Sequence, residues 1–187
     1  MLCGFLSAAE QHPELGTHVL VNPSVTAGET AENGVTSVLR LDFSSAQKAF
    51  TYEELCENRK EAERFAEDVI PSVIKDASDD LAKAGAIHDY LALHVTYDYT
   101  FSPQAYTAYG ALLEGKAVCQ GYSGAFNLLC KAAGIQAFAV ANRTHMWNAV
   151  KTDGKTYYYD VTFDDTGDVL TDTYKGLSAY SPDESYF

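Results

Sequence analysis

The feature that most constrains the fold is a change in the period of the hydrophobic pattern at Gly134. Apolar residues recur every three or four positions over residues 118–133, which predicts a helix that ends at this glycine. Three later segments, residues 135–142, 145–151 and 155–163, have the period of strands. Asp153-Gly154 is a strong signal for a two-residue hairpin turn between the last two. The order of these elements predicts an α+β fold, with helices first and an antiparallel sheet after them.

Two more helices are predicted upstream. Apolar residues between positions 62 and 74 recur at helical spacing, and Pro71 is expected to kink or end that helix. Ser78 is the predicted N-cap of the next helix, and the acidic residues after it suit the positive end of a helix dipole. The remaining segments are less regular: we interpret residues 96–115 as a linker, residues 21–34 as a loop and residues 35–43 as a strand.

Composition places the chain among ordinary globular proteins and restricts its partners. Its 187 residues, 47% of them hydrophobic, suffice for one domain with its own core. The net charge of −13 and the scattered basic residues argue against nucleic acid. An acidic surface either favours basic protein or peptide partners or serves only solubility. No apolar run is long enough for a transmembrane segment, and residues 1–9 lack the basic start and cleavage site of a signal peptide.

The four cysteines form no CxxC pair, so we expect no metal site built on them and no cofactor. A Cys3–Cys56 disulfide is left open. Cys119 is predicted at a helix N-terminus, where free backbone N–H groups and the helix dipole stabilise a thiolate. Cys130 lies amid leucines on the same helix, which predicts a buried thiol that packs in the core.

His145 and Asp160 can supply the base and the orienting acid that a nucleophilic thiol needs. The predicted hairpin sets Thr152 opposite Lys155, and continuing this register sets Asp160 opposite Trp147. His145 and Asp160 are then diagonal neighbours on adjacent strands. Taken singly, His145 also fits a structural strand histidine and Asp160 an acid near a turn. Taken in this order with Cys119, the three residues predict a catalytic constellation.

Three blocks of sequence resemble the core of the bacterial transglutaminase-like superfamily. They are "IHDYLALHVTYDY", "AYGALLEGKAVCQGYSGAFNLLCKAAGI" and "THMWNAVKTDGKTYYYDVTFDD", and the resemblance covers roughly residues 78–165. It implies a papain-like active site in which the family's nucleophile falls on Cys119, its base on His145 and its orienting acid on Asp160. Phe163 stands where many members carry tryptophan. Calcium dependence is not carried over, and "DDTGD" (residues 164–168) is read as an acidic turn without an EF-hand pattern.

The resemblance implies a cysteine-dependent acyl-transfer enzyme that acts on peptide or protein amide bonds through a thioester. Protease or deamidase activity is favoured over crosslinking; the alternative is a catalytically silent module that binds peptides or cell-wall polymers in the same groove. Residues 51–187 would form the catalytic domain, with residues 1–50 as an extension packed on it. The expected substrate is a protein or peptide, basic or linked to the cell wall. The expected location is the surface or exterior of a bacterium, with the cytoplasm as the alternative.

Several other side chains are candidates for supporting roles. The backbone N–H of Cys119 is expected to bind the oxyanion, aided by a side-chain donor, for which Tyr109 is slightly preferred over Gln104 and Gln120. Each of these three also fits a structural role. Trp147 is expected either to line the substrate groove or to shield the histidine.

Three further expectations concern residues near the predicted site. His88 falls on the apolar stripe of its helix and is interpreted as a core histidine. Asn148 is expected to point away from His145 and to bond the backbone. The clustered tyrosines either line a peptide groove or anchor loops; they are Tyr97, Tyr99, Tyr106 and Tyr109.

Overall fold

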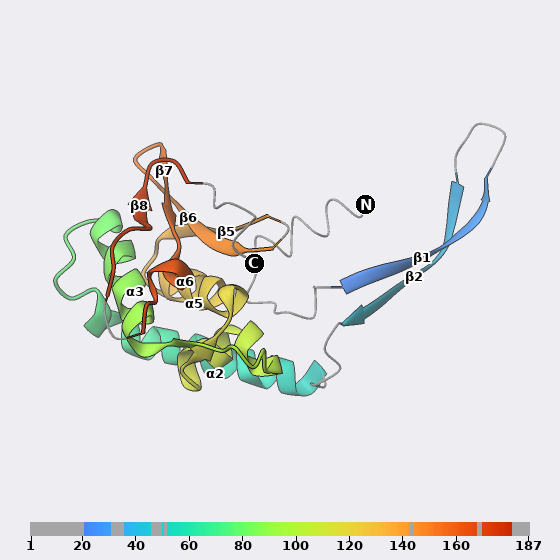
Figure 1. Cartoon of the computed structure of the whole chain (residues 1–187), viewed down its shortest axis with the longest axis horizontal. Helices are drawn as coiled ribbons and strands as arrows, with labels where there is room; N and C mark the ends of the chain where they lie inside the picture. The colour runs from blue at the N-terminus through green and yellow to red at the C-terminus, as the bar shows by residue number, and fades with distance from the viewer. Residues whose placement is uncertain are drawn as a thin grey trace.

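The computed structural model describes residues 21–30, 36–45, 50, 52–142, 144–167 and 170–180. Strands β1 (Val21–Thr30) and β2 (Thr36–Ser45) pair in antiparallel fashion (Figure 1). The strand expected over residues 35–43 is confirmed by β2, whereas the loop expected over residues 21–34 is wrong for β1. Its Pro23 is compatible with pairing because both strands of a two-stranded ribbon are edge strands.

Helix α2 (Tyr52–Val73) and helix α3 (Asp80–His94) correspond to the two predicted upstream helices. Helix α2 ends two residues after Pro71, as expected for a residue that cannot continue the backbone hydrogen-bond ladder. The N-cap of α3 is Asp79 and not Ser78. The Asp79 carboxylate accepts a hydrogen bond from the backbone N–H of Ala82 at 2.8 Å, which satisfies one of the free donors of the first turn.

Residues 96–115 are not a simple linker. They form β3 (Thr96–Tyr97), the 3₁₀ helix η3 (Pro103–Tyr106) and α4 (Ala108–Leu113), followed by β4 (Lys116–Ala117). Strands β3 and β4 pair in parallel, which brings this segment back beside the start of the next helix. Elements of two to six residues are too short to show a hydrophobic period, so the sequence pattern could not reveal them.

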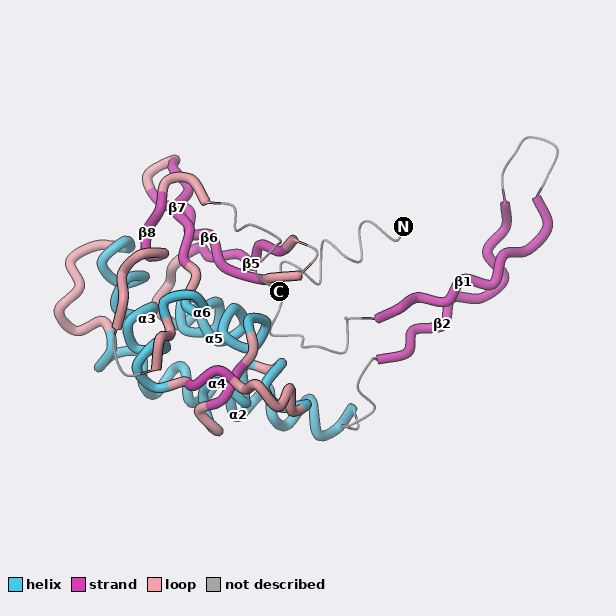
Figure 2. Tube along the Cα trace, in the orientation of Figure 1, coloured by secondary structure: helices cyan, strands magenta, loops and turns pink. Residues whose placement is uncertain are grey.

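Helix α5 (Cys119–Ala132) lies at the centre of the molecule and is confirmed at both ends. It contacts α2, α3 and α4 as well as β5 and β6 of the large sheet (Figure 2). Gly134 follows with a φ of +74°, the left-handed conformation that ends a helix. At the other end, a Cβ on Gly121 would lie 2.2 Å from the carbonyl oxygen of Ala105, so the η3 segment packs on α5 only because residue 121 is glycine.

The large sheet has the strand order β5–β6–β7–β8. These strands are β5 (Gln136–Ala141), β6 (Met146–Thr152), β7 (Lys155–Tyr159) and β8 (Lys175–Leu177). The predicted hairpin register is confirmed, since Thr152 pairs with Lys155 and Asn148 with Tyr159. Strand β7 ends earlier than predicted, however, because Asp160 caps the short helix α6 (Val161–Asp164). The expected pairing of Asp160 with Trp147 therefore does not form.

Within the described part of the chain, no helix combines the length and apolar character that crossing a bilayer requires.

Candidate active site

Cys119 is the first residue of α5 and its thiol is half-buried. The N-cap, Val118, has no side chain that can cap the helix, so free backbone N–H groups remain at this end. The N–H of Val118 donates to the carbonyl of Ala105 at 2.9 Å and holds the helix start against η3. Cys130, in contrast, is fully buried, and burial raises the pKa of its thiol well above the usual range. The prediction that Cys130 is a buried core thiol is confirmed.

His145 and Asp160 are in direct contact. The Nε2 atom of His145 lies 2.7 Å from Oδ2 of Asp160, and both side chains are buried. Because an ionised carboxylate only accepts hydrogen bonds, Nε2 carries the proton, and Nδ1 is the nitrogen that can face the thiol. Asn142 fixes the backbone of His145, since its Oδ1 accepts from the His145 N–H at 2.8 Å. The predicted contact is thus present, but it is not a diagonal strand pair, because His145 lies just before β6 and Asp160 just after β7.

Two aromatic rings lie nearly parallel to the imidazole of His145. The ring centroid of Phe163 is 4.5 Å away with an interplanar angle of 12°, and that of Trp147 is 5.9 Å away with an angle of 18°. Trp147 is itself 5% exposed. The rings pack on the buried imidazole, so the shielding alternative for Trp147 is compatible with the geometry, but its role stays a prediction.

The charge of His145 depends on its surroundings in two opposing ways. Burial lowers its pKa, but hydrogen bonds with Asp160 and Cys119 and the charges of both raise it to about 9. An imidazolium at neutral pH is the partner that a thiolate needs. Burial, and then the nearby charge of Cys119, also raise the pKa of Tyr97, to about 12, and that of Tyr106.

Asp160 divides its hydrogen bonds between helix and site. Its Oδ1 accepts from the backbone N–H of Phe163 at 3.3 Å and caps α6. Its Oδ2 accepts from His145 and also from the hydroxyl of Tyr180 at 2.8 Å. Sequence reasoning missed Tyr180 because the chain after residue 165 resembles no block of the family and offers no periodic signal around this residue.

The oxyanion candidates are placed differently. Within the described residues, Trp147 Nε1 and Gln104 Oε1 are buried without a hydrogen-bond partner. Gln104 precedes Ala105, whose carbonyl contacts the start of α5. Gln120 is buried beside Cys119, and Tyr109 packs against the hydrophobic core from α4. The oxyanion role of each of these residues stays a prediction.

Asn148 lies on β6 and points to α5, as expected. Its Nδ2 donates to the carbonyl of Ser123 at 3.1 Å and to Oδ1 of Asn127 at 2.9 Å. This buried contact ties the strand that follows His145 to the helix that begins with Cys119, so it helps to fix the distance between the two elements.

A second buried histidine lies behind this site. His88 contacts Oδ2 of Asp164 through Nε2 at 3.0 Å and Oδ1 of Asp89 through Nδ1 at 3.0 Å, which confirms it as a core histidine with both nitrogens bonded. The acidic turn expected over residues 164–168 is wrong for Asp164, because this residue ends α6 and is fully buried. Its neighbour Asp165 accepts a hydrogen bond from the hydroxyl of Tyr122.

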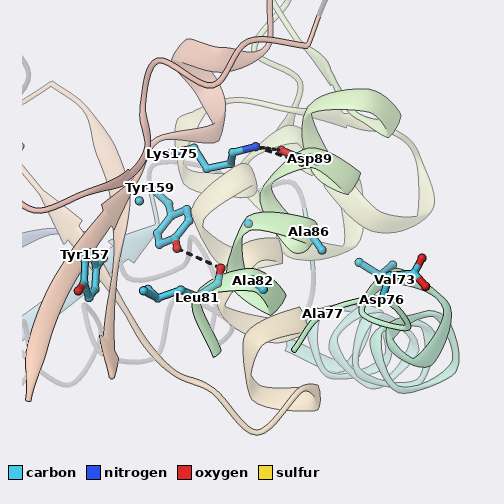
Figure 3. A pocket seen from close by; sticks show the side chains of 12 residues that line it. Val73, Asp76, Ala77, Leu81, Ala82, Ala86, Asp89, Tyr157, Tyr159 and Lys175 are labelled. Carbon is cyan, nitrogen blue, oxygen red and sulfur yellow. Dashed lines mark hydrogen bonds and ion pairs between the residues drawn. The ribbon is translucent and has the colours of Figure 1, made fainter. Parts of the chain in front are cut away.

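A cavity of about 600 Å³ opens between α3, the end of α2 and the strands β7 and β8 (Figure 3). Tyr159 and Leu81 line it, and Lys175 forms an ion pair with Asp89 at its edge. Neither Cys119 nor the histidine of the candidate site lines this cavity, so it is separate from the thiol.

The comparison with protein families decides the classification. The family model of the transglutaminase-like superfamily matches residues 67–167, more than half of the chain. The chain belongs to the transglutaminase-like superfamily. Its α+β fold is that of the superfamily, as the sequence predicted, and the matched stretch contains Cys119, His145 and Asp160. Membership of the transglutaminase-like superfamily supports a cysteine-dependent enzyme in general terms.

Two curated relatives and one solved structure are similar to this transglutaminase-like chain. The kyphoscoliosis peptidases of Homo sapiens and Mus musculus are both 26% identical, over 141 and 140 residues, which are 65% and 64% of this chain. The aligned stretch spans only 21% of either relative. A crystal structure of a TGase is 18% identical with a TM-score of 0.49, and the similarity covers 98% of this chain and 50% of that one.

Proposed function

We propose that this protein is a cysteine-dependent acyl-transfer enzyme that cleaves or deamidates peptide or protein amide bonds through a thioester on Cys119. The observation that carries the proposal is the buried His145–Asp160 contact of 2.7 Å, together with the thiol of Cys119 at the start of α5, which helps to raise the pKa of His145. A structural histidine has no need of a thiol partner at a helix N-terminus. The peptidase name of the two relatives agrees with this proposal.

Each step of the reaction uses a group in this constellation. The thiolate of Cys119 attacks the carbonyl carbon of the amide, and the free N–H groups at the start of α5 face the developing negative charge on the oxygen. As the C–N bond breaks, the proton on Nδ1 of His145 passes to the leaving amine. Asp160 holds the imidazole by Nε2 throughout and stabilises its positive charge. Water then opens the thioester, which releases the acid and restores the thiol.

A peptide or protein substrate is supported by the surface beside the thiol. The loop that follows β3 exposes Tyr99 and Phe101, which are 81% and 55% accessible. The carboxylate of Asp98 accepts hydrogen bonds from both the backbone N–H and the hydroxyl of Thr100 and of Ser102, so this loop is held rigidly. Large aromatic side chains presented on a rigid loop bind extended chains at low entropic cost.

The position of this loop and the charge of the chain narrow the substrate class further. The N–H of Asp98 donates to the carbonyl of Ala117, two residues before the thiol, which places the loop next to the candidate site. The net charge of −13 favours segments of basic character over acidic ones. The location at a bacterial surface stays a prediction.

Mass spectrometry on a peptide library with an added primary amine tests the function. Hydrolysis, deamidation and amine transfer give three distinct mass changes, and we expect the first two to exceed the third. Cys119→Ala should abolish all of them, whereas Cys130→Ala, the same chemical change at the buried thiol of the same helix, should retain them. Binding of peptides without any mass change, in wild type and Cys119→Ala alike, would establish the silent module instead.

A further inference from the structure

The chain continues past the stretch that matches the superfamily, and this continuation contacts the candidate site. The match ends at residue 167. Residues 171–180, which we call the C-terminal clasp, pack against both ends of α6. At the far end, the carboxylate of Asp164 accepts hydrogen bonds from the hydroxyl of Thr171 at 2.6 Å and from the backbone N–H groups of Thr173 and Tyr174 at 3.0 and 2.8 Å.

At the near end, the clasp contacts Asp160 twice. The carbonyl of Tyr174 accepts from the backbone N–H of Asp160 at 2.9 Å. The hydroxyl of Tyr180 donates to Oδ2 at 2.8 Å, the same oxygen that accepts from His145. The ring of Tyr180 also meets the ring of Trp147 edge-on, with centroids 5.9 Å apart. One tyrosine therefore contacts both the orienting acid and the aromatic shield of the histidine.

The clasp is anchored to the helical layer independently of Asp160. Lys175 forms ion pairs with Asp89 on α3 at 2.9 Å and with Asp172 at 2.6 Å; Figure 3 shows the first of these. Asp164, which the clasp surrounds, is paired with the fully buried His88 of α3. The Asp164 carboxylate is thus hydrogen-bonded both to α3 and to the clasp, which fixes the position of the clasp relative to α3. The Tyr180 hydroxyl is thereby held at a fixed place relative to α6.

A second donor on Oδ2 has two physical consequences. It fixes the direction of the carboxylate, and it takes up part of the negative charge that would otherwise act on the imidazole alone. Burial, and then the charge of Asp160, raise the pKa of Tyr180, so its hydroxyl keeps its proton at all pH values where the enzyme would work. The titratable groups around the couple are Cys119 on α5, Tyr174 and Tyr180 in the clasp, and Asp164 on α6.

We propose that Tyr180 is a positioning residue whose hydroxyl fixes Oδ2 of Asp160 and, through it, the imidazole of His145. The C-terminal clasp is then part of the active site of this protein, beyond the core that matches the superfamily. The inference rests on the proposed function, because it takes Asp160 as the residue that orients the base. A positioning role differs from simple packing, because the hydroxyl of Tyr180, and not its ring, would orient Asp160 and His145.

The test is the NMR titration of His145 in the full chain, in wild type, Tyr180→Phe and a variant with 3-fluorotyrosine at position 180. Phenylalanine keeps the ring and removes the hydrogen-bond donor, so Asp160 stabilises the imidazolium more strongly. The pH at the midpoint of the His145 titration should then rise by about half a pH unit. Fluorine makes the hydroxyl a stronger hydrogen-bond donor, and the titration midpoint of His145 in the 3-fluorotyrosine variant should therefore fall. Tyr158→Phe, which removes a hydroxyl from β7 on the strand that leads to Asp160, should leave the midpoint unchanged.

Turnover provides a second measurement. With any peptide amide that the wild type processes, Tyr180→Phe should lower kcat by about threefold to tenfold with little change in KM, since one hydrogen bond to a charged group is lost. If His145 titrates identically in the wild type and both Tyr180 variants, the positioning role is refuted, whatever the turnover. If no amide is processed but the midpoints shift in opposite directions as described, the proposed function fails while the positioning role stands.

Discussion

Asp160→Asn should change the charge state of His145 more than any other single substitution. The pKa of His145 rises from 6.5 to about 9 in the folded protein, against the effect of burial, because Asp160 and Cys119 bond to it and attract its positive charge. Asparagine keeps the shape of the side chain and an oxygen that can cap α6, but it removes the negative charge. Cys119 alone then opposes the effect of burial, and the pKa of His145 should fall towards 6.5, by up to about 2.5 units, which corresponds to about 3 kcal/mol of lost stabilisation of the imidazolium.

The same shift makes stability depend on pH. Because the folded pKa is the higher one, the stabilising contribution is fully present below pH 6.5 and is lost as the pH rises through about 9. The free energy of unfolding of the wild type should therefore decline across this window by up to about 3 kcal/mol, whereas Asp160→Asn should lack this decline. Urea denaturation at pH values on either side of the window, together with the NMR titration of His145, measures both quantities.

Asp153→Asn is the matched control for this experiment. It makes the same chemical change in the exposed turn of the same hairpin, where residue 153 has a φ of +50° that asparagine adopts readily. It should leave the titration of His145 and the pH dependence of unfolding as in the wild type. An Asp160→Asn protein whose His145 still titrates near pH 9 would refute the reasoning, because another group would then hold the imidazolium.

Two further predictions concern elements that place the thiol. Gly121→Ala should lower the free energy of unfolding by about 2 kcal/mol or more and reduce alkylation of Cys119, because the new methyl group would lie 2.2 Å from the Ala105 carbonyl oxygen. The control Gly124→Ala, whose new methyl group has no contact closer than 3.5 Å, should fold normally or gain up to about 1 kcal/mol of stability. If urea denaturation finds Gly121→Ala at least as stable as Gly124→Ala, the close approach at Gly121 is unimportant. Asp98→Ala should speed hydrogen exchange of the 98–102 loop, which loses its carboxylate acceptor, without moving the His145 titration; unchanged exchange would show that the loop is held by other contacts.

The sequence predicted the parts of the site that depend on local pattern. The helix that starts at Cys119 and the hairpin register follow from hydrophobic period and turn chemistry, and this register brings His145 near Asp160 although both residues lie just outside the paired strands. What it missed depends on contacts distant in the chain. Tyr180 follows β8, which pairs with β7 close to Asp160, and this pairing of short segments has no periodic signal. Asp164 reads as an exposed acid until α6 turns it towards His88, 76 residues earlier.

The boundary of β7 was missed for a different reason. The residues after Tyr159 include β-branched and aromatic side chains with high strand propensity, yet they form α6. Asp160 accepts a hydrogen bond from the N–H of Phe163, and this cap starts a helical turn where propensity alone favours a strand. A capping acid directly after a predicted strand is a signal that could have placed the boundary correctly.

The two-residue turn at Asp153-Gly154 influences the relative positions of His145 and Asp160 at the other end of its hairpin. Exposed turns usually tolerate insertions. Here, however, the turn helps to set which residue of β6 stands opposite each residue of β7, and side chains alternate between the two faces of a sheet. An insertion that shifted the pairing of β6 with β7 by one residue would displace His145, just before β6, from Asp160, just after β7, although neither residue had changed. Among length changes in this surface turn, those that change the strand register therefore act on the histidine eight positions before it.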